Sequence, residues 1–103
     1  MKVKSIIETK NCEYATLVDI DTMYNHFNDP YFIVNVAMSY YEKEVHYNYQ
    51  QIMNDININE ECKKEGHDPV YSIEATPILF NTSQIITIKS IGFDIEETTA
   101  DEN

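Results

Sequence analysis

The residues that could bind a metal ion are concentrated between positions 55 and 68. Asp55, Asn57 and Asn59 have the spacing of the first three ligands in a calcium-binding loop. Such a loop needs glycine at its sixth position and an acidic residue at its last, where this chain has Glu60 and Gly66. We therefore interpret this segment as the polar surface and cap of a helix, and we predict no calcium site.

The cysteine and histidine residues do not form a recognised metal-binding or catalytic pattern either. Cys62, Glu65, His67 and Asp68 are close in sequence, but a second Cys or His pair at zinc-finger spacing is missing. Nucleophilic catalysis by Cys12 or Cys62 would need a nearby histidine and an oxyanion hole. With two glycines in the whole chain, a glycine-rich loop that cradles phosphate is excluded. We therefore predict a protein that is not an enzyme and needs no metal or cofactor.

The charge balance is the strongest feature of the sequence. Eighteen Asp and Glu residues outnumber seven lysines, arginine is absent, and the formal net charge is −11. Nucleic-acid binding draws much of its affinity from neutralised phosphates, which arginine recognises best. We therefore expect no direct nucleic-acid binding, and instead a partner protein that presents a basic surface.

The predicted contact residues combine clustered acids with tyrosines. Carboxylates spaced along a helix or strand can imitate a row of phosphates, and tyrosines supply large, rigid anchors at interfaces. The competing interpretation is that the acids only confer solubility and that the tyrosines are half-buried sheet residues. The predicted partner-binding residues are Tyr41, Glu42, Glu44, Tyr47, Tyr49, Asp55, Glu60, Glu61, Glu65 and Asp68.

The segment from residue 30 to residue 49 organises the elements that would position these side chains. Apolar residues occupy every second position from Phe32 to Tyr40, and the alternation resumes at Val45 after a short charged stretch. A period of two predicts a long antiparallel hairpin. Residues 42–56 also fit a helical stripe, so a helix that begins near Glu42 stays open as an alternative.

The rest of the chain divides into short elements. We expect strands at residues 2–8, 13–20, 71–79 and 85–95. A shift of the apolar phase in the last strand predicts either a bulge near Lys89 and Ser90 or burial on both faces around Ile85 and Ile86. Pro77 cannot donate to a ladder, which places it at an edge or a bulge. A short helix capped by Asp21 or Thr22 is expected to end by residue 27, and further helical segments cover 50–58 and 59–66, the second capped by Asn59.

These elements predict one α+β domain over residues 1–96, mainly an antiparallel sheet of five or six strands with one or two short helices. Residues 97–103 are acidic or small, which predicts a flexible acidic tail. The predicted core consists of Phe32, Val34, Val36, Met38, Ile73, Ile86, Ile88 and Ile91.

The sequence also indicates a compartment. It contains no stretch of about 18 apolar residues and no basic segment before an apolar run, so we expect neither a membrane span nor a signal peptide. Two cysteines suit a reducing environment better than a disulfide framework. We therefore expect a cytoplasmic protein, in the host cytoplasm if a bacteriophage encodes it.

In size, acidity, Asn/Ile/Tyr-rich composition and lack of a catalytic motif, the chain resembles the small inhibitors that bacteriophages encode. Anti-CRISPR proteins, restriction inhibitors and uracil-DNA glycosylase inhibitors are such proteins, and the resemblance rests on character rather than on a motif. It implies a protein that blocks the nucleic-acid-binding surface of a host nuclease or surveillance complex, for example by DNA mimicry.

Two alternatives from other classes remain. One is a small β-barrel protein that binds single-stranded DNA and carries an acidic C-terminal tail, which the absence of arginine disfavours. The other is a structural or assembly subunit that joins a neighbour, including a second copy, through an exposed edge strand.

Overall fold

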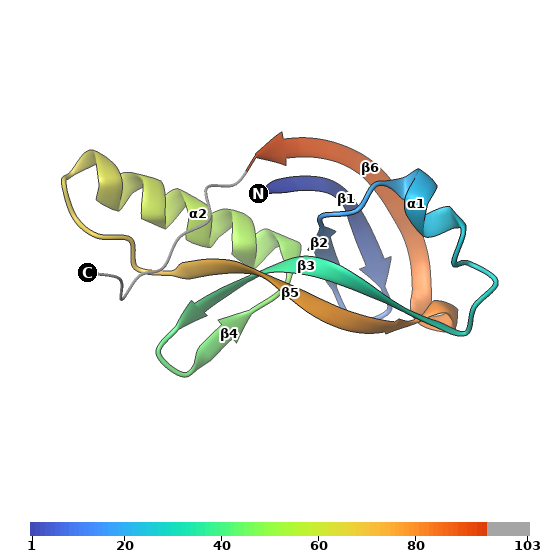
Figure 1. Ribbon diagram of the computed structural model, residues 1–103. Helices are drawn as coiled ribbons and strands as arrows, with labels where there is room; N and C mark the ends of the chain where they lie inside the picture. Colours follow the sequence, from blue (N-terminus) through green and yellow to red (C-terminus); the bar gives the residue numbers. More distant parts are fainter. Residues whose placement is uncertain (95–103) are drawn as a thin grey trace.

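The computed structural model describes residues 1–94, which form a six-stranded antiparallel sheet, two α-helices and one 3₁₀ turn (Figure 1). This architecture confirms the predicted α+β class. The predicted domain end at residue 96 and the predicted tail at 97–103 lie outside the described residues. Within residues 1–94, no helix is long and apolar enough to cross a membrane.

The sheet consists of two halves that meet at β3. Its strand order is β4-β3-β2-β1-β6, with β5 paired along the other edge of β3. β2 meets β3 through the Thr16–Val36 pair, and the Leu17 N–H donates to the Asn35 carbonyl beside it. The elements are β1 (Lys2–Thr9), β2 (Glu13–Thr16), α1 (Ile20–Tyr24), β3 (Tyr31–Tyr41), β4 (Glu44–His46), α2 (Tyr49–Lys64), β5 (Ser72–Asn81), the 3₁₀ turn η1 (Thr82–Gln84) and β6 (Ile85–Asp94).

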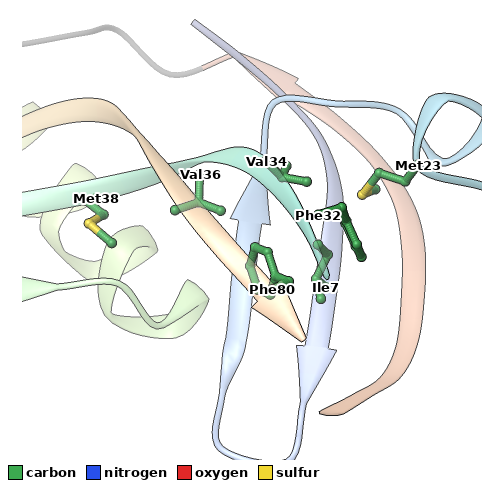
Figure 2. Close-up of a cluster of buried hydrophobic side chains, with 7 residues drawn as sticks. All are labelled: Ile7, Met23, Phe32, Val34, Val36, Met38 and Phe80. Atoms are coloured by element: carbon green, nitrogen blue, oxygen red, sulfur yellow. The ribbon is translucent and has the colours of Figure 1, made fainter. Parts of the chain in front are cut away.

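Two buried clusters hold the fold together, and β3 contributes to both. Successive strand residues point to opposite faces, so Val36 enters one cluster and Ala37 the other. Figure 2 shows the first cluster, which consists of Ile7, Met23, Phe32, Val34, Val36, Met38 and Phe80. The second cluster lies under α2 and consists of Val3, Ala15, Ala37, Ile52 and Ile73.

The predicted core is correct except at one position. Phe32, Val34, Val36, Met38 and Ile73 are buried, and Ile88 and Ile91 pack against the clusters as partly buried residues. Ile86, however, is 55% exposed.

A bulge explains the exposure of Ile86. Glu8 pairs with Thr87 but Thr9 pairs with Ile85, which leaves Ile86 as the extra residue of β6. A second bulge lies between Ser90 and Phe93, close to the bulge predicted near Lys89 and Ser90. Two bulges in one strand fit the pronounced curve that β6 follows (Figure 1).

Both helices begin at a polar cap. Asp19 caps α1 by accepting the Thr22 N–H at 3.0 Å, so the predicted caps Asp21 and Thr22 are wrong by two or three residues. Asn48 caps α2 by accepting the Gln50 N–H at 2.9 Å. The choice between strand and helix for residues 42–56 is thereby resolved: a three-residue strand reaches His46, and the helix starts at Tyr49.

The predicted break at Asn59 does not occur, because α2 continues for 16 residues from Tyr49 to Lys64. Asn59 lies buried on the inner side of this helix. Gly66 ends the helix as expected, with φ at +78° in the left-handed region that favours glycine. The His67 N–H donates to the Cys62 carbonyl and the Gly66 N–H to the Lys63 carbonyl, which is the Schellman arrangement.

β5 is an edge strand, and Pro77 lies at its free edge as predicted. The Asn35 carbonyl points toward β2, because it accepts the Leu17 N–H. The Asn35–Pro77 pair is therefore a non-hydrogen-bonded pair of the β3–β5 ladder. The N–H that proline lacks would have pointed outward, so the outer edge of β5 is interrupted near its middle.

Candidate partner-binding surface

The turn between β3 and β4 holds an acidic residue in a strained conformation. Tyr41 pairs with Glu44, so Glu42 and Lys43 form a two-residue loop. The φ angle of Glu42 is +53°, and within residues 1–94 no other non-glycine residue has a positive φ. Gly or Asn fits this position of a tight hairpin far better than Glu. Glu42 therefore makes the turn less stable than glycine or asparagine would at this position.

Six of the seven predicted contact acids are exposed. We call these six residues the acidic end, which consists of Glu42, Glu44, Glu60, Glu61, Glu65 and Asp68. Figure 1 shows the β3–β4 turn and the C-terminal end of α2 toward the same end of the molecule. An exposed ion pair joins Glu61 Oε1 to Lys64 Nζ at 3.4 Å and offsets part of this charge.

Asp55, the seventh predicted acid, does not belong to this surface. It is 1% exposed, so its assignment as a contact residue is corrected. Its carboxylate accepts the Ser39 hydroxyl and lies 2.8 Å from His46 Nδ1. Helical spacing explains the burial, because Asp55 follows the buried Ile52 by three residues and precedes the buried Asn59 by four.

The three predicted tyrosines occupy different environments. Tyr41 and Tyr47 are exposed, at 41% and 45%. Tyr47 stacks on Tyr14 with ring centroids 5.7 Å apart, and burial together with the Cys12 side chain raises the pKa of Tyr14. Tyr49, the first residue of α2, is half-buried against Phe93, so much of its ring serves the core.

Tyr71, a half-buried neighbour of Tyr41, is a residue that the predicted contact set omits. Its ring lies 5.8 Å from that of Tyr41 and 5.7 Å from that of His46, measured between centroids. Asn59 fixes its backbone by two 2.9 Å hydrogen bonds, one from Asn59 Nδ2 to the Tyr71 carbonyl and one from the Tyr71 N–H to Asn59 Oδ1. No sequence pattern indicates this pairing across twelve residues.

Two arrangements of polar side chains in residues 1–94 bear on metal binding and catalysis. Within residues 1–94, no three His, Cys, Asp or Glu side chains are placed to hold a metal ion. Ser39, His46 and Asp55 are the residue types of a hydrolase triad, but Ser39 bonds to the aspartate rather than to the histidine and is fully buried. They form a structural network, not a nucleophilic site.

An apolar hollow lies between α1 and β6. It measures about 400 Å³, and Tyr24, Phe27 and Ile86 are among its lining residues. None of its lining residues is an acid, lysine, histidine or cysteine, so the hollow is predominantly apolar.

The acidic end with its neighbouring tyrosines is therefore the most chemically distinctive surface of residues 1–94. Comparison with protein-family models, with curated proteins and with solved structures finds no match to this chain.

Proposed function

We propose that this protein is a stoichiometric inhibitor that binds the basic, nucleic-acid-binding surface of a host protein through its acidic end. The conformation of Glu42 carries the proposal. Residues held in sparsely populated backbone regions cluster at binding and active sites. At the tip of a hairpin, Glu42 has no role in the core, so contact with a partner is the purpose that fits its charge.

The distribution of charge supports the same conclusion. Seven of the eighteen acids lie between residues 42 and 68, together with three of the seven lysines. With Asp55 in the interior, the six acids of the acidic end remain for contact with a basic surface. Lysine and arginine side chains that normally hold phosphates respond to charge and spacing, so exposed carboxylates can occupy their place.

The tyrosines supply binding free energy that exposed ion pairs alone do not provide. Exposed ion pairs contribute roughly 0–1 kcal/mol each, and salt screens them. Tyr41 lies opposite Glu44 in the hairpin ladder, and Tyr47 exposes a second aromatic ring where it stacks on Tyr14. Burial of such rings is the usual source of strong binding at protein interfaces. The acids would then steer the partner, and the tyrosines would hold it.

Affinity capture tests the proposal. The purified protein is immobilised and exposed to bacterial lysate, with and without nuclease treatment, and retained proteins are identified by mass spectrometry. We expect one basic nucleic-acid-binding protein, which its own DNA or RNA displaces and whose activity the inhibitor blocks at a one-to-one ratio. Salt at about 0.5 M should weaken the complex by screening.

A pair of charge-matched variants makes the test specific. The first, Glu42→Gln with Glu44→Gln and Asp68→Asn, neutralises three acids of the acidic end. The second, Asp21→Asn with Asp29→Asn and Asp94→Asn, neutralises three exposed acids elsewhere. Capture should fail with the first variant and persist with the second. Equal loss in both would show that net charge alone matters, and direct binding of single-stranded DNA at physiological salt would favour the DNA-binding alternative.

A further inference from the structure

Two tyrosine rings converge where the β3–β4 hairpin meets the start of β5. Tyr41 ends β3 and Tyr71 directly precedes β5, and their ring planes are inclined at 57° with centroids 5.8 Å apart. Tyr41 is 41% exposed, so its ring reaches solvent. The pair is held from the interior, because the buried Asn59 fixes the Tyr71 backbone through two hydrogen bonds.

Two glutamates of the β3–β4 hairpin lie next to Tyr41, one across the ladder and one in the chain. Glu44 lies opposite Tyr41 in the β3–β4 ladder, and the strained Glu42 follows Tyr41 in the chain. Burial raises the pKa of Tyr71, and the negative charges of Asp55 and Glu44 raise it further. Because Glu44 directly faces Tyr41 in the ladder, a cation that covers the Tyr41 ring would lie within reach of the Glu44 carboxylate.

Aromatic faces next to carboxylates are suited to one kind of side chain. A guanidinium group stacks on an aromatic ring through its plane and donates paired hydrogen bonds to a carboxylate through its edge. A lysine ammonium can donate hydrogen bonds to a carboxylate as a point charge, but it has no plane that can stack on the ring. The negative charge around the rings excludes an acidic ligand, and the exposed ring of Tyr41 offers a face that can be covered.

We propose that Tyr41, Tyr71, Glu42 and Glu44 form a receiving site for an arginine side chain of the partner. This inference rests on the proposed function and adds the chemical identity of the anchor. A guanidinium at this site lies against the tyrosine rings, and the hairpin carboxylates accept its N–H groups. The site prefers arginine to lysine, whereas the rest of the acidic end does not distinguish them.

Short basic peptides test the inference without the partner. Blocked tetra-arginine and tetra-lysine peptides are titrated into the full chain at low and moderate salt, with affinity measured by calorimetry and ring contacts by NMR of the tyrosine signals. Tetra-arginine should bind about three- to tenfold more tightly than tetra-lysine and should shift the Tyr41 and Tyr71 ring signals.

Matched variants separate the site from general charge. Tyr41→Leu should remove the preference for arginine, and Glu44→Gln should weaken arginine binding by about threefold. Tyr24→Leu, at a 71% exposed tyrosine on α1, should change neither. Tyr71→Phe, which keeps the ring, should retain the preference. Thermal unfolding of each variant verifies that it is folded, and Tyr41 is exposed enough for its replacement to leave the core intact.

The outcomes distinguish this inference from the proposed function. Equal binding of both peptides, or an unchanged preference in Tyr41→Leu, would overturn the arginine site even if capture of a nucleic-acid-binding protein succeeds. A clear arginine preference that depends on Tyr41, combined with failed capture, would keep the site and refute the inhibitor role.

Discussion

His46 Nδ1 lies 2.8 Å from Asp55 Oδ2, which joins β4 to the middle of α2. The same carboxylate oxygen accepts the hydroxyl of Ser39 on β3. One buried acid therefore connects three elements and sets the position of α2 relative to the hairpin. Among residues 1–94, every buried side-chain nitrogen and oxygen atom has a hydrogen-bond partner, so removal of this acid would create the first exceptions.

Replacing Asp55 by alanine should lower the free energy of unfolding by about 3 to 5 kcal/mol, because it leaves Ser39 and His46 without their acceptor. Urea denaturation at pH 7 measures the change. Glu60→Ala, at an exposed position of the same helix, should change stability by less than about 0.5 kcal/mol. The double variant Ser39→Ala with Asp55→Leu should recover part of the loss. Equal effects at residues 55 and 60 would contradict a structural role for the network.

Glycine at position 42 should stabilise the protein by about 0.5 to 1 kcal/mol, since glycine adopts φ of +53° without strain. The same change should weaken binding to the partner, because it removes an acid of the acidic end. Lys43→Gly is the matched control at a neighbouring turn position without positive φ, and it should destabilise slightly. Chemical denaturation and the capture assay measure the two effects separately. A less stable Glu42→Gly variant would show that the turn is not strained.

Ala37→Leu should destabilise the fold by about 1 to 3 kcal/mol, because Ala37 is fully buried under α2 and a larger side chain overpacks the cluster. Its cross-strand neighbour Ala75 is exposed and provides the control. Ala75→Leu should alter stability by less than about 0.5 kcal/mol. Thermal or urea unfolding compares the two, and similar losses would place α2 elsewhere than on β3.

Asp19, the N-cap of α1, should make the stability of the protein depend on pH. The backbone N–H of Thr22, and then its hydroxyl, hold the pKa of Asp19 below its ordinary value in the folded protein. A lowered pKa in the folded state means that the stabilisation is complete above the unfolded pKa of about 4 and is lost as the pH falls through the folded value. Asp19→Ala should therefore reduce Tm at pH 7 and have little effect near pH 2. A loss of Tm that is equal at pH 7 and at pH 2 would contradict this role of Asp19.

Local patterns in the sequence were sufficient for most of the fold. Alternation predicted β3, and turn residues placed the connection between β5 and β6 at Asn81–Gln84. The sequence did not predict contacts between residues that are distant along the chain. Asn59 looked like a helix cap because asparagine favours caps, yet it satisfies the Tyr71 backbone instead. Ile86 fitted an alternating strand, and the bulge opposite Glu8 and Thr9 turned it outward.

The candidate surface was predictable in part for the same reason. Exposure of Glu42, Glu44 and the acids of the second half of α2 follows from their charge. Asp55 was misassigned, because burial of a carboxylate depends on Ser39 and His46 in other elements. Tyr71 entered the surface through a contact with Tyr41 that only the β3–β5 register creates.

The pairing of β1 with β6 has a consequence for biosynthesis. β1 spans Lys2–Thr9, and its partner along one edge, β6, spans Ile85–Asp94, so a ribosome releases β6 well after β1. Until β6 emerges, β1 has a free edge and the chain cannot close its sheet. The β1–β6 ladder can therefore form only after residues 85–94 have been translated, at a rate limited by contact between segments that are distant in sequence. A nascent chain that stalls before residue 85 would expose β1 to other chains, so its fate would depend on chaperones.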